Sequence, residues 1–248
     1  MQARRYRIRD GILRFEDGVT VFEDYLQIPE TVTSVDFNEV RHVLKPFSLM
    51  NTLIKEIDFK QVITVKGVHL PSGVKITENL YWADEIFSQG CIVEHSSRMK
   101  YLGIYDHREL VYLSGSVSGH LPLRTEQRDI IYNAGYGVYS PGNHITFGDP
   151  VADEYPSLVA DFDLWALDKC RVIFLDLTNL SPGTCAELGY IIAKGWAKTK
   201  RVYYLYKGTS NFFINGLLRD LIKVSSIEEF LERDRQNYGF RRNAKITT

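Results

Sequence analysis

The sequence has 248 residues, of which 44% are hydrophobic and 25% charged, a balance typical of soluble globular proteins. Its formal net charge is −1, and it has no long basic run, so binding of nucleic acid through bulk positive charge is not expected. The length fits one large domain, or one ordinary domain with a sizeable additional piece.

Cysteine and histidine usage predicts neither disulfides nor a metal site. The three cysteines, Cys91, Cys170 and Cys185, are odd in number and form no CxxC motif, which favours buried thiols in a reducing compartment. The six histidines are scattered, so no metal and no cofactor are expected. No apolar run reaches about 18 residues, and no signal-peptide core is present. A cytoplasmic protein without a membrane partner is predicted.

Residues 1–108 are predicted to form a β-rich accessory domain. Short segments alternate apolar and polar residues, and Asp10-Gly11 and Asp17-Gly18 provide turn signals between them. Residues 19–21 and 63–65 resemble each other and are followed by similar segments about 42 residues apart, a weak echo with too few copies to indicate a repeat array. A small sheet, packed on the second domain or on a neighbouring subunit, is the simpler interpretation.

Residues 109–248 alternate strand and helix patterns, which predicts βαβ units and a parallel sheet. Ligands of open α/β sheets bind beyond the carboxyl ends of the strands. The expected strands are 110–114, 137–141, 172–175 and 201–206, and the expected helices are 123–133, 156–169, 182–193, 211–222 and 225–235.

The stretch 171–190 combines a buried strand, a tight loop and the start of a helix. Ser181 is a favourable N-cap and Pro182 a favourable first helical residue. The amides of Gly183 and Thr184 are then among the unpaired donors at a helix N-terminus, where an anion can bind. Glu187 places a carboxylate one turn further along.

Three motifs occur in this half: Tyr112-Leu-Ser-Gly-Ser-Val-Ser-Gly119, Asp163-Leu-x-x-Leu167 and Ser181-Pro-Gly-Thr-Cys-Ala-Glu187-Leu-Gly189. In this order they resemble the nucleoside 2-deoxyribosyltransferase superfamily, and within it the 2'-deoxynucleoside 5'-monophosphate N-glycosidases. The resemblance covers about residues 110–206. It implies a flavodoxin-like, doubly wound parallel sheet.

The resemblance implies a retaining glycosyl mechanism. Glu187 would attack C1' of the sugar to form a glycosyl ester, and Asp163 would protonate the departing base. The helix pattern places Asp163 at the flank of an apolar stripe, where desolvation could raise its pKa toward that of a useful general acid. Tyr112 corresponds to a tyrosine that orients the nucleophile in relatives.

The resemblance also implies a substrate with a 5'-phosphate. Relatives that act on free nucleosides usually carry an Asp six residues before the nucleophile, where this chain has Ser181. A serine hydroxyl and helix amides would accept a phosphate that an Asp would repel. The phosphate site would be completed by the first loop, with Gly115, Ser116, Ser118 and Gly119. In the family a neighbouring subunit often lends a polar side chain, for which Asn215 is the candidate, so a homodimer or larger homo-oligomer is expected.

Other interpretations remain open at this stage. Thr184-x-x-Glu187 is also a capping box, in which Glu187 would only cap its own helix. Asp163 alone would be an ordinary solvated helix residue. Three other activities compete with a nucleotide hydrolase: a deoxyribosyltransferase, a glycohydrolase of a dinucleotide such as NAD, and a non-catalytic nucleotide sensor.

Overall fold

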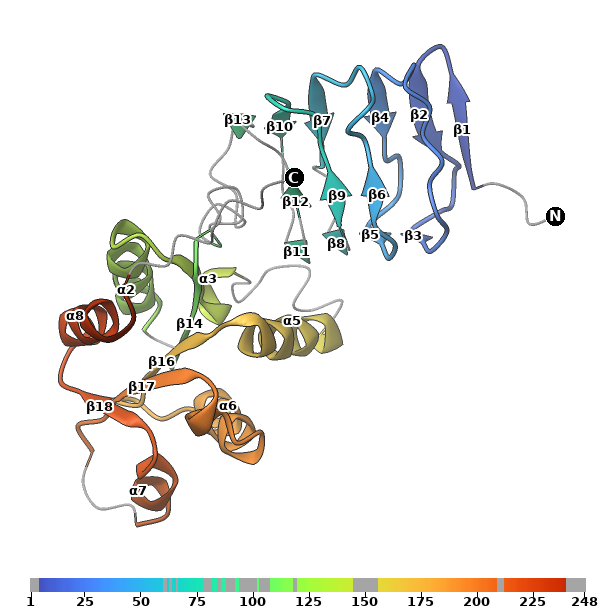
Figure 1. Ribbon diagram of the computed structural model, residues 1–248. Coiled ribbons are helices and arrows are strands. Elements are labelled where there is room, and N and C mark those ends of the chain that lie inside the picture. The colour runs from blue at the N-terminus through green and yellow to red at the C-terminus, as the bar shows by residue number, and fades with distance from the viewer. Residues whose placement is uncertain are drawn as a thin grey trace. The chain divides into compact units, whose positions relative to one another are not determined.

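The computed structural model describes residues 5–59, 62, 64–65, 67–77, 82–83, 86–87, 92–93, 102, 108–117, 120–144, 156–208 and 212–239. The chain divides into two compact units (Figure 1). The first comprises Met1–Lys100 with Ile104–Asp106, and the second Tyr101–Gly103 with His107–Thr248. Each unit is described by itself below.

The first unit is built from short parallel strands that stack in successive turns of the chain. Val21 opposes His42, His42 opposes Thr64, and Thr64 opposes Trp82, so each turn takes about 20 residues. The stacks are β2 (Ile12–Phe15) with β4 (Ser34–Asp36); β7 (Glu56–Asp58), β10 (Lys75–Thr77) and β13 (Ile92–Val93); β3 (Val21–Phe22), β5 (His42–Val43), β8 (Thr64–Val65) and β11 (Trp82–Ala83); and β6 (Phe47–Ser48), β9 (Val68–His69) and β12 (Ile86–Phe87).

Strand β1 (Tyr6–Arg9) starts this unit as an antiparallel partner of β2. The connecting residues Asp10 and Gly11 both have positive φ, 52° and 77°, as a tight hairpin turn requires. The hairpin expected at Asp10-Gly11 is therefore confirmed. The second Asp-Gly step forms no hairpin, because β2 pairs with β4 and not with β3.

The interior of the first unit contains equivalent residues from successive turns. Phe15 stacks on Phe37 at 5.7 Å between ring centroids, and Phe37 packs on Phe59 at 5.2 Å. All three rings are buried. The aromatic ladder supplies apolar contact along the stack, where two or three strand residues per turn could not bury enough surface on their own.

The β-rich character expected for residues 1–108 is confirmed within the described residues, but the strands form several small sheets and not one. The 42-residue echo spans two turns, since β3 pairs with β5 and β5 pairs with β8. One turn is not visible as a repeat because successive turns preserve buried apolar character and not residue identity, as where Phe22 opposes Val43 and both are buried.

Within the described residues, the second unit contains a five-stranded, all-parallel sheet in the order β15-β14-β16-β17-β18. In chain order this is second, first, third, fourth, fifth, which is compatible with a flavodoxin-like core. The expected parallel α/β sheet is confirmed. Its strands are β14 (Leu110–Gly115), β15 (Gly137–Tyr139), β16 (Val172–Asp176), β17 (Arg201–Leu205) and β18 (Ile222–Val224).

Helices flank this sheet on both faces (Figure 1). Val111 and Leu113 of β14 lie in a buried cluster with Phe230 of α8, whereas Tyr112 between them contacts α6 on the other face. This alternation is the pleat of a strand buried on both sides. The helices are α2 (Leu121–Asn133), α3 (Pro141–His144), α5 (Pro156–Lys169), α6 (Pro182–Ala193), the 3₁₀ turn η1 (Trp196–Lys198), α7 (Phe212–Leu218) and α8 (Ile227–Tyr238).

Two details at the carboxyl end differ from the prediction. The helix expected over 211–222 is shorter, and residues 222–224 instead form the edge strand β18. Helix α8 begins at Ile227 and not at the expected residue 225, because its capping box is formed by Ser226 with Glu229 and not by Ser225 with Glu228. Ser226 accepts the amide of Glu229 at 3.2 Å, and Glu229 accepts the amide of Ser225 at 2.6 Å. Adjacent serines and glutamates made the two registers indistinguishable in the sequence.

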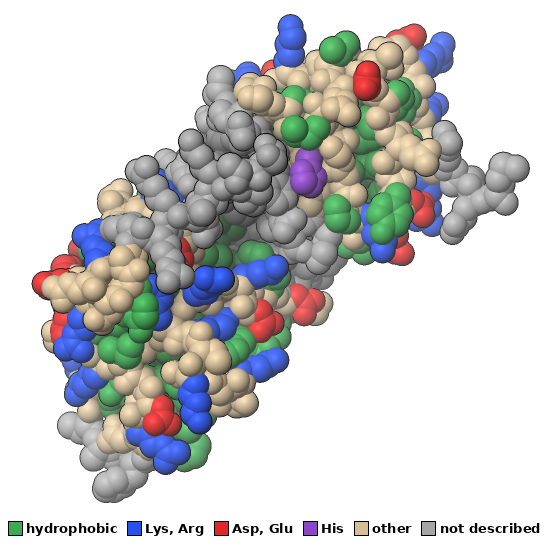
Figure 2. Space-filling view, in the orientation of Figure 1, with side chains coloured by type: hydrophobic (Ala, Val, Ile, Leu, Met, Phe, Trp, Pro, Cys, Tyr) green, Lys and Arg blue, Asp and Glu red, His purple; other side chains and the backbone are tan. Residues whose placement is uncertain are grey.

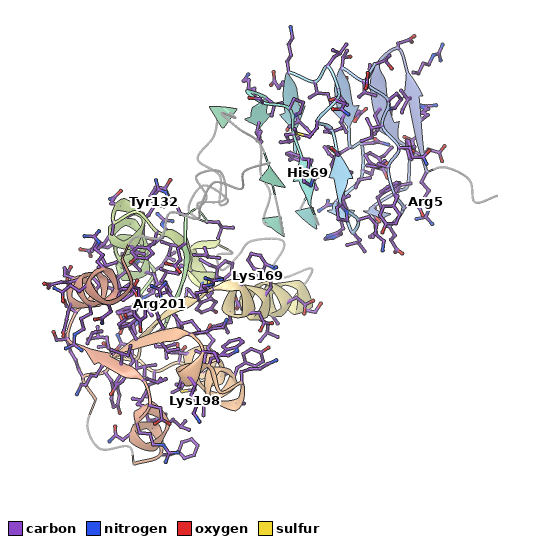
Figure 3. All side chains as sticks on the ribbon, in the orientation of Figure 1. Arg5, His69, Tyr132, Lys169, Lys198 and Arg201 are labelled. Atoms are coloured by element: carbon purple, nitrogen blue, oxygen red, sulfur yellow. The ribbon has the colours of Figure 1, made fainter. Side chains whose placement is uncertain are left out.

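A buried carboxylate attaches α8 to the sheet. Asp234 accepts hydrogen bonds from the hydroxyls of Tyr136 at 2.7 Å and Tyr203 at 3.0 Å, and forms an ion pair with Arg201 at 3.0 Å. Arg201 also pairs with Glu109 at 2.5 Å, and Figure 3 labels it within the second unit. This network satisfies a fully buried charge with three partners, as burial of a charge requires.

The surface carries mixed charge. Basic and acidic side chains are interspersed over the visible face of the second unit (Figure 2). No helix among the described residues is both long and apolar enough to cross a membrane.

The aromatic ladder predicts a stability difference between two aromatic residues of the first unit. Phe37→Ala should lower the free energy of unfolding by about 3–5 kcal/mol, because it leaves a cavity between two buried rings. Tyr25→Ala removes a side chain that is 72% exposed and should change stability by under about 0.5 kcal/mol. Urea unfolding followed by circular dichroism measures both, and equal effects would contradict the ladder.

Candidate functional site

Strand β14 brings two hydroxyl groups to the α6 face of the sheet. Tyr112 and Ser114 are two residues apart, so both side chains point to the same face. Both residues are fully buried. Ser114 is the penultimate residue of β14, so its hydroxyl lies near the carboxyl end of the strand. Strand β14 lies between β15 and β16, where the strand order reverses, and ligands of open α/β sheets bind beyond the carboxyl ends at such a point.

Glu187 lies on α6 and receives both hydroxyls. The Tyr112 hydroxyl donates to Oε1 at 2.7 Å, and the Ser114 hydroxyl donates to Oε2. The capping-box interpretation of Glu187 is wrong: the N-cap is Ser181, whose Oγ accepts the amide of Thr184 at 3.2 Å. The carboxylate of Glu187 is thus held in place by two residues of strand β14.

Asp163 on α5 likewise accepts a hydrogen bond from a tyrosine of the sheet. The hydroxyl of Tyr139, the last residue of β15, donates to Asp163 Oδ1 at 2.9 Å. Asp163 is neither exposed nor fully buried, so the expectation of an ordinary solvated aspartate is wrong. The helix α5 has the predicted bounds. Of its expected apolar stripe, Val159, Trp165 and Ala166 are described, and Ala166 is fully buried. The side chains at 158 and 162 lie outside the described residues.

The two tyrosines are neighbours across the sheet. Tyr112 opposes Tyr139 in the parallel register of β14 and β15, and their rings stack at 5.6 Å with an interplanar angle of 22°. Each is 1% exposed or less. Two adjacent, immobilised rings therefore place one hydroxyl on each carboxylate.

Burial changes the acidity of both carboxyls, and the charge of Glu187 adds to the change at Asp163. Desolvation, followed by the charge of Glu187, raises the pKa of Asp163 to about 7, against the opposing hydrogen bond from Tyr139. Burial also raises the pKa of Glu187, and the hydrogen bonds from Ser114 and Tyr112 oppose this rise. Asp163 can therefore hold a proton near neutral pH beside a carboxylate that two donors stabilise.

The expected anion site at the N-terminus of α6 is partly occupied by the chain itself. The Thr184 amide is bonded to Ser181 Oγ, and the hydroxyls of the two residues are 2.9 Å apart. The prediction of a free Thr184 amide is therefore wrong, because the N-cap side chain takes it. Gly183 is exposed at the first turn, and among the described residues its amide has no partner.

The first loop follows β14 directly. Gly115 opposes Asp176, the last residue of β16, and Ser116 after it is buried. Ser118 and Gly119, expected to complete the loop, lie outside the described residues.

The loop rests on a buried ion pair that the sequence did not reveal. Arg124 of α2 pairs with Asp176, which also accepts Gln127 Nε2 at 3.0 Å. Burial would raise the pKa of Asp176, but the hydrogen bonds from Gln127 and Arg124 lower it below its ordinary value. A Cβ on Gly115 would lie 2.1 Å from the Arg124 guanidinium, so a larger residue here would have to displace Arg124 from its ion pair with Asp176. Helix spacing placed Arg124 on α2 but could not indicate that it turns inward.

Asn215 is not brought to these residues. It is exposed on α7, which follows β17. Its expected role depends on a second copy of the chain and stays a prediction.

No protein-family model matches the sequence, and no curated protein matches it. Among the described residues, no group of three or more His, Cys, Asp or Glu side chains is arranged to hold a metal ion. The chemistry of the site follows from the paired carboxyls and their tyrosines.

The raised pKa of Asp163 predicts a pH-dependent cost to stability. Between about pH 4 and pH 7 the unfolded state ionises this group while the folded state keeps it protonated, so stability falls as pH rises by up to about 1.4 kcal/mol per unit. Asp163→Asn removes this cost. The stability of the variant relative to wild type should therefore increase with pH and level off above about 7.

Urea unfolding at a series of pH values measures this difference. Asp161→Asn is the matched control, because Asp161 is exposed on the same helix. A constant difference between Asp163→Asn and wild type across this pH range would contradict a raised pKa.

Proposed function

We propose that the protein is an N-glycosidase that cleaves the bond between base and sugar in a nucleoside 5'-monophosphate. The observation that carries the proposal is the pair of carboxyls. Both carboxylate oxygens of Glu187 accept a hydrogen bond, one from Tyr112 and one from Ser114. Burial and the charge of Glu187 together raise the pKa of the neighbouring Asp163 to about 7. Two carboxyls with separate proton states are what a retaining glycosidase needs.

In this proposal Glu187 is the nucleophile. Its ionised oxygen attacks C1', and the hydroxyls of Tyr112 and Ser114 keep the carboxylate oriented for attack and oppose the rise in its pKa that burial causes. Asp163 is the general acid that gives its proton to the departing base. Water then hydrolyses the glycosyl ester, with Asp163 acting as the base in this second step.

The phosphate is assigned to the carboxyl ends of β14 and β16. Gly115 ends one strand and Ser116 follows it, and Ser181 and Gly183 follow the other strand across a short loop. The Gly183 amide and the hydroxyls of Ser181 and Thr184 can donate hydrogen bonds to a phosphate. The hydrogen bond between these two hydroxyls would then be replaced by a charge-assisted hydrogen bond to the phosphate. The absence of a carboxylate at position 181 favours a phosphorylated substrate over a free nucleoside.

The proposal places the second unit in a flavodoxin-like, doubly wound fold and in the nucleoside 2-deoxyribosyltransferase superfamily, which its three motifs resemble. The strand order and the flanking helices support this assignment. A homodimer, with Asn215 contributed by the neighbouring subunit, belongs to the same proposal. The first unit has no assigned part in the chemistry.

Base release tests the proposal directly. Wild type is incubated with ribo- and deoxynucleoside 5'-monophosphates, free nucleosides and NAD, and free base is measured by chromatography. Release from the monophosphates is expected, and Glu187→Gln should reduce it by about a thousandfold or more, because the neutral amide cannot form the ester. Glu126→Gln, on the exposed side of α2, should leave the rate unchanged.

The other outcomes of this assay separate the rival activities. Turnover of free nucleosides that requires an acceptor base would indicate a transferase, and release from NAD would indicate a dinucleotide glycohydrolase. Nucleotide binding without any release, in wild type and in Glu187→Gln alike, would contradict the proposal and favour a sensor.

The two carboxyls predict a bell-shaped dependence of kcat/KM on pH. Activity should fall at acidic pH as Glu187 is protonated, and above about pH 7 as Asp163 loses its proton. Asp163→Asn should remove the alkaline limb from the residual activity, whereas Asp161→Asn should preserve both limbs. An alkaline limb that persists in Asp163→Asn would show that another group is the acid.

A further inference from the structure

Tyr139 was not among the residues that the sequence identified, yet its hydroxyl contacts Asp163. We propose that Tyr139 is a positioning residue that holds Asp163 Oδ1, so that the transferable proton resides on Oδ2, and that stabilises the carboxylate left behind. This inference rests on the proposed role of Asp163 as the general acid. It adds a second tyrosine–carboxyl pair to the one formed by Tyr112 and Glu187.

The fold holds the Tyr139 hydroxyl in place. Tyr139 is 1% exposed, ends the short strand β15, and stacks on Tyr112 of the adjacent strand. Its hydroxyl lies 2.9 Å from Asp163 Oδ1. Because the ring is packed within the sheet while Asp163 projects from a helix, the sheet determines where the carboxyl group stands.

The hydrogen bond assigns the proton between the two oxygens of Asp163. Burial, and then the charge of Asp163, raises the pKa of Tyr139 well above its ordinary value, so the phenol stays protonated and acts as a donor. Among the described residues Asp163 has one hydrogen bond, which Oδ1 accepts. In the neutral carboxyl group the proton is therefore carried by Oδ2.

In the proposed step a proton leaves Asp163 while the bond from sugar to base is exchanged for a bond to Glu187. The O–H bond at Asp163 Oδ2 breaks and its proton moves to a ring nitrogen of the base. The electron pair of the C1'–N bond leaves with the base, and a lone pair of Glu187 forms the C1'–O bond. Asp163 ends as a carboxylate, whose hydrogen bond from Tyr139 is stronger than that of the neutral acid. Tyr139 thus stabilises the product of proton transfer more than the reactant.

Four titratable groups of the surrounding elements interact with the carboxyl group of Asp163 or with the hydroxyl of Tyr139. They are Glu187 from α6, Tyr112 from β14, Tyr139 from β15 and Cys170 after α5. The negative charge of Glu187 opposes ionisation of Asp163, and the Tyr139 hydrogen bond favours it. Removal of the Tyr139 hydroxyl leaves the opposing interaction in place, so Asp163 should become a weaker acid.

Tyr139→Phe tests this inference because it retains the stacked ring and removes only the hydroxyl. We expect kcat for base release to fall by about 10- to 100-fold, the range of a lost hydrogen bond to a charged group, with little change in KM. The alkaline limb of the pH profile should move to higher pH. Tyr136→Phe is the matched control, since Tyr136 is 2% exposed and its hydroxyl donates to Asp234 at 2.7 Å.

A second measurement does not depend on turnover. The ¹³C signal of the Asp163 carboxyl group, assigned by its loss in Asp163→Asn, is titrated in wild type and both phenylalanine variants. The pKa of Asp163 should rise in Tyr139→Phe and stay unchanged in Tyr136→Phe. An unchanged pKa in Tyr139→Phe overturns the inference even where wild type releases base. Absence of base release by wild type instead overturns the proposed function, independently of this titration.

If Tyr139→Phe does not fold, 3-fluorotyrosine incorporated at position 139 gives the opposite test. The more acidic phenol is a stronger donor at nearly the same volume, so it should lower the pKa of Asp163. A pKa that rises or does not move would overturn the inference.

Discussion

Two tyrosine hydroxyls on adjacent strands donate hydrogen bonds to two neighbouring carboxyl groups, and the candidate site depends on these two bonds. Tyr112 and Tyr139 stack on each other and donate to Glu187 and Asp163 respectively. Desolvation raises the pKa of both carboxyls, and the hydrogen bonds from these tyrosines oppose that rise. With them, one carboxyl can be ionised while its neighbour keeps a proton.

The rest of the second unit serves to place these groups. The parallel register of β14 with β15 aligns the two tyrosines, and the helices α5 and α6 bring a carboxyl to each. On the opposite face, Asp234 is held by Tyr136, Tyr203 and Arg201, and its hydrogen bonds attach α8 to the sheet. The two faces use the same pairing of tyrosine with carboxylate, but on the α8 face an arginine neutralises the charge. Asp163 has no ion pair among the described residues, and burial followed by the charge of Glu187 raises its pKa to about 7.

Sequence reasoning located the parallel sheet and the helices that carry Glu187 and Asp163, because hydrophobic periodicity and caps such as Ser181 are local signals. It could not locate Tyr139 or Arg124, since their importance depends on contacts with residues distant in the sequence. The Thr184 amide was misassigned because the N-cap hydroxyl competes for it. In the first unit, the 42-residue echo was two turns of a stack whose single turns share burial rather than residue type.

The central claim is that Glu187 forms a covalent glycosyl ester, and trapping that ester tests it most directly. The reaction with a deoxynucleoside 5'-monophosphate is quenched in acid during turnover, and the protein is digested for peptide mass spectrometry. The account predicts that the peptide containing Glu187 carries the added mass of a deoxyribose 5-phosphate, and that Glu187→Gln carries none. Base release with an adduct on another residue would contradict it.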